Sequence, residues 1–378
     1  MTGTEVAVPM LRWGILGTGW ISTMFTKDLL ADRPDADCRH AISAVGSSSI
    51  SKGKTFVANC WKETTTHTRP RVYDSYQAVY TDTNVDIVYV GTPHSEHKKN
   101  CLDAIAAGKH VLCEKPLTIN AKEGQEVVDA AREKGVFLME AVWTRFSPLF
   151  SALKEELFVK KTIGDVHRMF VDFGNKMPLD TLPSTHRLKD PALGAGALLD
   201  IGIYALTYAS VILGDWKLGL QHPTPVVTSS LDIHDGMDLS NVIVLDYPSK
   251  DTTGHESTKT AICTSSFKCK SPDDFARIDG SCGSILIFGL AASVPGGFRI
   301  LLYPASPGEE KSETERIFTV EKPKDTLGFF WEADAVARDI AAGRTENAVV
   351  PLDESIRMMQ LMDKIRKDAG LVYPQDTV

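Results

Sequence analysis

The chain has 378 residues, more than the roughly 250–300 at which a single hydrophobic core stops growing, so two domains are expected. Hydrophobic residues make up 43% and charged residues 24%, which is typical of a globular protein and excludes a largely disordered chain. The net charge of −8 without a basic run argues against a nucleic-acid partner, and the apolar runs look shorter than the roughly 20 residues of a membrane span.

The first part of the chain, residues 10–145, alternates between short apolar segments and amphipathic segments. Strands are expected at residues 11–16, 40–46, 85–90, 110–113 and 136–140. Helices are expected between them at residues 21–31, 97–107 and 121–134. This alternation predicts an α/β fold, a Rossmann-type doubly wound parallel sheet that binds a dinucleotide.

Residues 146–378 follow a different rhythm. Helices are expected at residues 148–159 and 196–213, and two more close the chain at 329–342 and 353–369. Between these pairs, about six strands are expected at residues 226–233, 240–245, 259–267, 275–279, 284–288 and 298–303. Successive strands joined by turns predict an α+β domain with an open, mainly antiparallel sheet.

A glycine turn follows the first expected strand. Gly17-Thr18-Gly19 stands between that strand and the helix that begins with Trp20 and Ile21. The first glycine permits the tight turn, and the second lets the backbone approach a pyrophosphate at the helix N-terminus. Ser22 occupies the third position of the Gly-x-Gly-x-x-Gly pattern, where glycine or alanine is usual.

The segment after the second strand is expected to select the cofactor. Ser47, Ser48 and Ser49 stand there, followed by Lys52, where NAD-binding proteins tend to place a carboxylate. Hydroxyls and a nearby cation suit the 2′-phosphate of NADP, so NADP is favoured over NAD. The alternative is a serine-rich loop with solvated lysines.

Two further segments carry acid–base chemistry. Lys115 follows a strand at the carboxyl edge of the parallel sheet, where ligands bind in such folds. Asp200 and Tyr204 are spaced to share one face of a helix. A phenol titrates near pH 10, so Tyr204 needs a cation such as Lys115 to act as a base. The alternatives are a solvated lysine and a buried structural tyrosine.

Other polar and aromatic residues have less specific readings. His94, Glu96 and His97 lie close together, but no third ligand is evident for zinc, so no metal is expected. Aromatic faces and a bidentate donor suit a polyol ring. The candidates for a substrate wall are Trp143, Arg145, Phe146, His186 and Arg187.

Four motifs in order resemble the glucose–fructose oxidoreductase/inositol dehydrogenase family. They are the Gly17 turn and the segments 91–97 (GTPHSEH), 114–116 (EKP) and 200–204 (DIGIY). The segments 141–146 (AVWTRF), 330–334 (FWEAD) and 370–374 (GLVYP) are similar to the branch of dimeric dihydrodiol dehydrogenases and fungal NADP-dependent D-xylose 1-dehydrogenases. Two departures stand out: relatives often have arginine where Ser48 stands, and the glycine run is interrupted as Gly194-Ala195-Gly196.

The resemblance implies more than the residues do. It implies that Thr92, Pro93, His94, His97 and Glu114 flank the cofactor and that the Lys115–Pro116 bond is cis. It also implies a homodimer paired through the open sheet of the second domain. Ile285, Ile287, Phe288, Ile300 and Leu302 offer apolar groups on both phases of that sheet.

Together these observations predict an NADP-dependent dehydrogenase that oxidises D-xylose at C1 to the lactone. Tyr204 takes the hydroxyl proton, Lys115 supports it electrostatically, and Asp200 orients the lysine or a sugar hydroxyl. The alternatives are a dihydrodiol dehydrogenase, another sugar reductase of the family, and a dinucleotide-sensing regulator like the fungal galactose-regulon repressor. Seven scattered cysteines and no apolar leader near Met1 predict a cytoplasmic protein.

Overall fold

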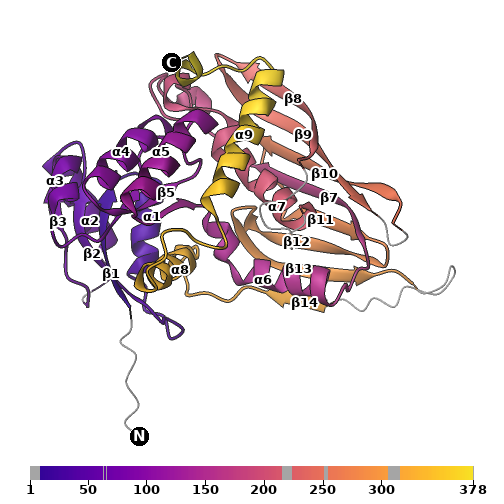
Figure 1. The fold of residues 1–378 in the computed structure, drawn as a ribbon, viewed down its shortest axis with the longest axis horizontal. Coiled ribbons are helices and arrows are strands. Elements are labelled where there is room, and N and C mark those ends of the chain that lie inside the picture. Colours follow the sequence, from indigo (N-terminus) through magenta and orange to yellow (C-terminus); the bar gives the residue numbers. More distant parts are fainter. Residues whose placement is uncertain are drawn as a thin grey trace, which may run out of the picture. The chain divides into compact units, whose positions relative to one another are not determined.

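The structure is a computed structural model that describes residues 9–62, 64, 66–214, 224–250, 254–304 and 316–377. The chain divides into two compact units. The first contains Met1–Phe146 and Lys322–Ile356, and the second contains Ser147–Glu321 and Arg357–Val378. Each unit is built on one sheet (Figure 1).

The first unit has a six-stranded sheet in the order β3-β2-β1-β4-β5-β6, with all neighbours parallel. Its strands are β1 (Met10–Leu16), β2 (Arg39–Gly46), β3 (Arg71–Tyr73), β4 (Ile87–Val90), β5 (His110–Glu114) and β6 (Leu138–Ala141). Its connecting helices are α1 (Trp20–Leu29), α2 (Ile50–Cys60), α3 (Tyr76–Thr81), α4 (His94–Ala106) and α5 (Ala121–Lys134). The predicted Rossmann-type sheet is therefore confirmed.

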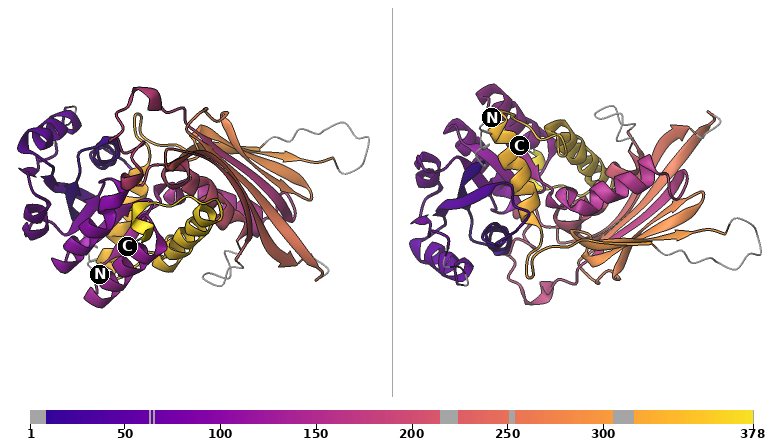
Figure 2. Two further views of the ribbon diagram at one scale, coloured as in Figure 1. Left: turned by 90° about the horizontal axis from the view of Figure 1, so that it is seen from above. Right: turned by 90° about the horizontal axis from the view of Figure 1, so that it is seen from below.

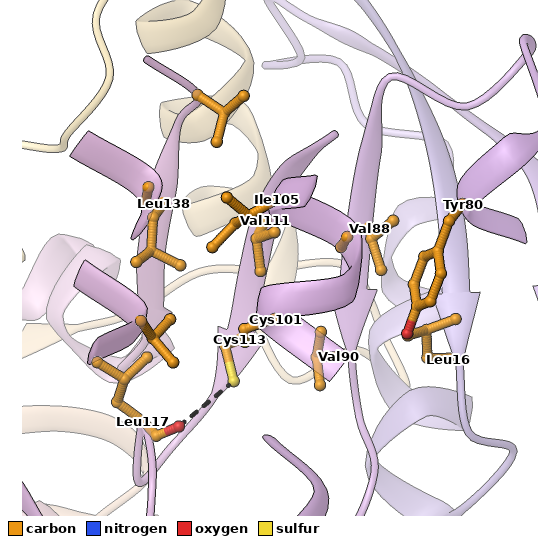
Figure 3. Packing of buried hydrophobic residues seen from close by; sticks show 14 of the residues in the cluster. Leu16, Tyr80, Val88, Val90, Cys101, Ile105, Val111, Cys113, Leu117 and Leu138 are labelled. Carbon is orange, nitrogen blue, oxygen red and sulfur yellow. Dashed lines mark hydrogen bonds between the residues drawn. The ribbon is translucent and has the colours of Figure 1, made fainter. Parts of the chain in front are cut away.

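A core of aliphatic side chains surrounds the central strands of this sheet. Val88, Val90, Val111 and Leu138 are fully buried in it, as Figure 3 shows. Strands covered on both faces carry apolar residues without alternation, and β4 and β5 follow that rule. This packing gives the loops at the strand ends a rigid base.

The segment Lys322–Ile356 lies in the first unit, whereas the sequence-based division placed it in the second domain. Its helix α8 (Phe329–Ala341) is held at its start by Asp28 of α1. One carboxylate oxygen of Asp28 accepts hydrogen bonds from the backbone N–H groups of Gly328 at 2.6 Å and Phe329 at 2.8 Å. A buried carboxylate at a helix N-terminus satisfies amides that have no partner within the helix. Helix α8 therefore belongs to the first unit.

The second unit has an eight-stranded sheet in the order β14-β13-β12-β11-β7-β10-β9-β8. Its strands are β7 (Val166–Gly174), β8 (Val226–His234), β9 (Met237–Lys250), β10 (Glu256–Ser266), β11 (Asp274–Gly280), β12 (Gly283–Ala291), β13 (Val294–Leu302) and β14 (Arg316–Thr319). Every described pair is antiparallel except β7 with β10. The mainly antiparallel sheet is confirmed, but the prediction missed β7 and β14.

The helices of the second unit include α6 (Pro148–Lys154), the π-helix Glu155–Val159, the π-helix Leu198–Gly202 and α7 (Ile203–Leu213). Helix α9 (Leu352–Asp368) begins in the first unit and ends in the second. Helices α6 and α7 lie on one face of the sheet, and the other face carries no helix of this unit in its described part (Figure 2). Cys263 of β10 points toward α7, where its thiol donates to the carbonyl oxygen of Ala205.

The opposite face of this sheet, here called the outer face, carries a row of residues paired across neighbouring strands. The row consists of Val244, Ile262, Phe170, Arg277, Leu286, Arg299 and Ile317. Phe170 is 38% exposed and Ile317 is 59% exposed. By contrast, Ile285, Ile287 and Ile300, which the sequence offered among the apolar groups on both phases of the sheet, are all buried on the helix-covered face.

The segment Pro191–Leu213 corrects the expectation that every apolar run is too short to span a membrane. It has 23 residues, and its 18-residue apolar window has a mean hydropathy of 1.7, which would suffice to cross a bilayer by length and composition. Within the protein, 94% of that window is buried. A core helix that is apolar on all sides has the same composition, and we interpret the segment as one.

Candidate active site

The glycine turn after β1 lies against the end of β4. Gly17 has a φ of +83°, and a Cβ there would lie 2.8 Å from the carbonyl oxygen of Gly91. Gly19 precedes α1 and has open space where a Cβ would point. Ser22 fills the third position of the motif because Gly91 leaves room for it: a Cβ on Gly91 would lie 2.2 Å from the Ser22 hydroxyl. The turn therefore presents backbone and the first amides of α1, the groups that bind a pyrophosphate.

The segment after β2 forms a small polar cluster. The Ser47 hydroxyl donates to the carbonyl oxygen of Ser49, and the Ser49 hydroxyl accepts from the Lys52 N–H at the start of α2. The ammonium of Lys52 lies 3.1 Å from the Ser48 hydroxyl and is exposed. Hydroxyls, a helix N-terminus and a cation are thus gathered where the ribose of a dinucleotide is expected.

Lys115 leaves the sheet directly after β5. Its side chain is largely buried, and its bond to Pro116 is cis, as the resemblance implied. The preceding residue, Glu114, is buried and accepts a hydrogen bond of 2.6 Å from the Tyr89 hydroxyl. Cys113 turns back toward the same loop, and its thiol donates to the carbonyl oxygen of Leu117 (Figure 3).

His97 joins the loop after β4 to the loop after β5. Its two ring nitrogens lie 2.9 Å from the carbonyl oxygens of Thr92 and Pro116. Burial lowers the pKa of His97 to about 4, and the charge of Lys115 acts in the same direction. Both nitrogens face backbone carbonyl oxygens at hydrogen-bond distance, and one of them donates in the neutral ring, which argues against the metal site considered from sequence. His94 lies beside it, with ring centres 5.7 Å apart.

Glu140 in β6 is a residue of this region that the sequence analysis missed. Its carboxylate accepts a hydrogen bond of 2.9 Å from the N–H of Leu117, two residues after Lys115. The side chain is 1% exposed, and burial raises its pKa to about 7. A glutamate within an apolar strand was the available signal. His97 and Glu140 thus both contact the backbone of the loop that follows Lys115, at Pro116 and Leu117.

Asp200 and Tyr204 lie in the second unit, in two consecutive helical segments that we call the helical corner: the π-helix Leu198–Gly202 and the start of α7. Asp200 lies in the π-helix Leu198–Gly202, and Tyr204 lies in the first turn of α7. Tyr204 is 4% exposed and packs beside Phe173, with ring centres 5.6 Å apart. Asp200 accepts a hydrogen bond of 3.1 Å from the guanidinium of Arg187. The spacing read from sequence therefore spans a π-turn rather than a regular α-helix.

The predicted substrate-wall residues have contacts of their own. Trp143 is 4% exposed and stacks on Phe329 at 4.3 Å, within the first unit. Arg145 forms an ion pair of 2.5 Å with Glu354, also in the first unit. Phe146 is half-buried and ends the 3₁₀ helix that begins at Trp143. Their proposed substrate contacts stay predictions.

His186 and Arg187 belong to the second unit, on the turn-rich segment before the π-helix. The ring of His186 accepts from the N–H of Leu188, which turns the chain locally. Arg187 is exposed and forms an ion pair with Asp200. Arg187 is therefore the predicted wall residue whose guanidinium meets a predicted catalytic residue.

One group among the described residues has the composition of a metal site. It comprises Asp37, Cys38 and Asp334, with ligand atoms within 4.8 Å of one another. Asp334 is already paired with Arg33, and Asp37 with Arg338. Burial raises the pKa of the Cys38 thiol to about 12, so the thiolate that a metal requires is disfavoured. The group is a salt-bridge cluster.

Comparison with known families gives two matches along the chain. An oxidoreductase family with an NAD-binding Rossmann fold matches residues 11–142. The GFO/IDH/MocA C-terminal domain matches residues 153–286.

Individual relatives cover nearly the whole chain. The D-xylose 1-dehydrogenase (NADP(+)) of Hypocrea jecorina is 36% identical and covers 97% of this chain and 93% of its own length. The trans-1,2-dihydrobenzene-1,2-diol dehydrogenase of Homo sapiens is 32% identical and covers 97% and 99%.

Solved structures share the fold at lower identity. The aldose–aldose oxidoreductase of Caulobacter crescentus, complexed with glycerol, has a TM-score of 0.73 at 22% identity and covers 96% of this chain and 98% of that chain. A 3-ketoreductase of Actinomadura kijaniata, in complex with NADP, has a TM-score of 0.72 at 21% identity and covers 94% and 97%.

The buried Glu140 gives a pH-dependent stability. Its folded pKa of about 7 lies above the ordinary 4.5, so its contribution is fully present below pH 4.5 and is lost as the pH rises through 7. The shift corresponds to about 3 kcal/mol. Glu140→Gln keeps an acceptor for Leu117 but cannot ionise. We expect the difference in Tm, variant minus wild type, to increase by several degrees from pH 5 to pH 8.

The exposed Glu133 on α5 provides the matched control, because Glu133→Gln removes a carboxylate that stays in water. Melting curves by circular dichroism at each pH make the measurement. Parallel pH profiles for wild type and Glu140→Gln would contradict the assignment.

Proposed function

Because the chain belongs to the GFO/IDH/MocA family of oxidoreductases, we propose that it oxidises a hydroxyl of a cyclic sugar, D-xylose at C1, with NADP as the acceptor. The observation that supports this most is the 36% identity, over 97% of the chain, to a D-xylose 1-dehydrogenase that uses NADP(+). The product would be the lactone.

In this proposal, Tyr204 accepts the proton of the C1 hydroxyl as the C–H bond breaks and the C=O bond forms. Lys115 favours the phenolate by its positive charge. Asp200 orients the lysine or a sugar hydroxyl, and its ion pair with Arg187 fixes its carboxylate. When bound, NADP supplies the acceptor for the hydride.

Cofactor binding rests on the first unit. Gly17, Thr18, Gly19, Trp20 and Ile21 would bind the pyrophosphate through backbone N–H groups. Thr92, Pro93, His94, His97 and Glu114 would line the nicotinamide half of the site. Ser47, Ser48, Ser49 and Lys52 would bind the 2′-phosphate, and no carboxylate stands among them to repel it.

Two other functions are weighed against this one. Oxidation of a trans-dihydrodiol is supported by relatives at 32% identity. It is the same type of reaction, the oxidation of a carbon that carries a hydroxyl group, on a different substrate. A dinucleotide-sensing regulator would not require the Lys115, Asp200 and Tyr204 set, which the chain retains. The proposal of an enzyme is therefore favoured.

We also propose that the protein is a homodimer paired through the outer face. The row that includes Ile262, Phe170, Leu286 and Ile317 places apolar groups on a face that no helix of its own unit covers in the described residues. Such a face is either covered by another protein surface or exposed to water. Two-fold pairing of identical faces is the commonest assembly of soluble proteins. The guanidinium groups of Arg277 and Arg299 within the row are already paired with Asp279 and Asp274 of the same chain, so their charges do not stand unpaired on this face.

A cytoplasmic location is proposed on the chemistry of the cysteines. All seven lie in the described part of the chain, and all are free thiols. Free thiols persist in a reducing compartment.

Replacing the proposed base tests the chemistry. Tyr204→Phe keeps the ring against Phe173 and removes the hydroxyl. We expect turnover to fall by roughly 10²–10⁴-fold, the range for a lost acid–base group, with NADP affinity unchanged. Turnover is measured as NADPH absorbance with D-xylose and with a dihydrodiol, and NADP affinity by fluorescence titration. Turnover near the wild-type rate would refute the role of Tyr204.

Lys52 tests the choice of cofactor. Lys52→Ala is expected to weaken NADP binding about tenfold and NAD binding little, because only NADP carries the 2′-phosphate. Lys54→Ala provides the control, since Lys54 is also exposed on α2. Equal losses for the two cofactors would show that Lys52 is a solvated charge only.

The dimer is tested by light scattering at micromolar concentration. We expect twice the chain mass of 41.4 kDa for the wild type and a shift toward the single mass for Phe170→Glu. Val159→Glu, at a position 65% exposed but outside the outer face, is expected to stay dimeric. A wild-type mass of one chain that does not change on concentration would rule out the dimer.

A further inference from the structure

The segment after α9, residues 371–376, reaches the corner that carries Asp200 and Tyr204. Tyr373 is fully buried, and its hydroxyl donates a hydrogen bond of 2.5 Å to the carbonyl oxygen of Ala195. Ala195 lies just before the π-helix Leu198–Gly202, which runs directly into α7. A residue almost 180 positions later in the chain thus bonds to the backbone at the start of this helical corner.

Asp238 of β9 holds the same corner from the sheet. Its Oδ2 atom accepts 2.9 Å hydrogen bonds from the N–H of Leu198 and from the side-chain amide of Asn241. Leu198 begins the π-helix, so this carboxylate satisfies an amide that has no partner within the helix. Asp238 is fully buried, and its Oδ1 atom has no hydrogen-bond partner among the described residues.

Gly196 lies between these two side chains. Its φ is +143°, and a Cβ there would lie 2.4 Å from Oδ1 of Asp238 and 2.7 Å from the hydroxyl oxygen of Tyr373. The carbonyl oxygen of Gly196 accepts from the N–H of Asp200 at 3.2 Å. Both side chains therefore touch a backbone unit that is bonded to a predicted catalytic residue.

The 371–376 segment is itself held firmly. Asp376 accepts from the N–H of Tyr373 at 2.9 Å and from the guanidinium of Arg366 at 2.5 Å. Arg366 of α9 is 2% exposed, and its guanidinium carbon lies 4.9 Å from the centre of the Tyr373 ring. The hydroxyl of Tyr373 is thereby presented to Ala195 by a rigid turn rather than by a loose chain end.

We propose that Tyr373 is a positioning residue for the reaction. It acts through the backbone of residues 195–198, at the start of the π-helix that leads into α7, and so fixes the position of Tyr204. The inference rests on the proposed role of Tyr204 as the base. A misplacement of a reacting group by about 1 Å can cost up to 100-fold in rate, so a hydrogen bond at the entrance of its helix affects turnover directly. This gives the 371–376 segment a role in catalysis without contact with substrate.

The test compares two tyrosines that make the same kind of bond. Tyr373→Phe removes the bond to Ala195, and Tyr208→Phe removes the bond of 3.1 Å from the fully buried Tyr208 to the carbonyl oxygen of Ala292. Both variants lose one buried hydroxyl bond to backbone within the second unit. We expect kcat with D-xylose to fall about tenfold for Tyr373→Phe alone, with the KM for NADP within twofold of wild type.

A double-mutant cycle separates positioning from stability. If Tyr373 acts through Tyr204, then Tyr373→Phe has no further effect on the residual turnover of Tyr204→Phe. An equal tenfold loss in both backgrounds would overturn the inference, because it would show a general effect on the fold. Equal kcat values for Tyr373→Phe and Tyr208→Phe would overturn it as well.

Asp376→Ala provides a second route if Tyr373→Phe does not fold. It releases the turn from a partly exposed position and is expected to lower kcat while Tyr373 keeps its hydroxyl; an unchanged kcat would count against the inference. The proposed function fails separately, through Tyr204→Phe turnover near the wild-type rate. A slow Tyr204→Phe with a fast Tyr373→Phe contradicts only the positioning role.

Discussion

Parallel pairing of β1, β4 and β5 places three chemically distinct loops at one edge of a single sheet. Leu16 pairs with Val90, and Val90 pairs with Cys113, so the residues that follow these strands emerge side by side. The approach is close enough that Gly17 cannot carry a side chain against the carbonyl of Gly91. The pyrophosphate turn, the loop of His97 and the loop of Lys115 all depend on this one constraint.

The sequence predicted the alternation of strands and helices and the glycine turn that separates two of these elements. The central strands β4 and β5 contain short apolar runs, and the glycine turn stands at the end of β1, whereas β3, with only three residues, was not predicted. Strand β7 was missed because the polar His167 and Arg168 interrupt its apolar pattern, although Arg168 points to the outer face and pairs with Asp279. The bond between Asp28 and α8 joins residues about 300 positions apart, and no local pattern reveals it.

Side-chain chemistry alone was a weaker guide to the site. An aromatic face and a guanidinium suit a sugar, but the sequence does not reveal that Trp143 stacks on Phe329 or that Arg145 pairs with Glu354, and their substrate contacts stay predictions. Glu140 was overlooked because a carboxylate in an apolar strand resembles an interruption rather than a brace. The substrate class came from the resemblance, since packing and periodicity carry no information about which polyol is bound.

Buried acids recur in both units, and burial raises their pKa values. Burial raises the pKa of Asp238 to about 6 and that of Glu332 well above its ordinary value. Glu332 is fully buried in α8, and neither of its carboxyl oxygens has a hydrogen-bond partner among the described residues. Burial of a carboxyl without partners in an apolar setting favours its neutral form, so Glu332 is disfavoured as a second negative charge beside Glu114.

The contact between Ser22 and Gly91 has a consequence for the evolution of the dinucleotide turn. The helix carries a hydroxymethyl group where most such turns have a smaller residue, and the neighbouring strand end compensates by having none. The side chains at positions 22 and 91 would occupy the same small volume, so a substitution at one position limits the residues allowed at the other. Across descendants of this chain, a larger residue at position 91 requires that position 22 lose its hydroxyl, as in alanine or glycine, and that the ring of Tyr89 shift, so positions 22 and 91 should covary although almost seventy positions separate them.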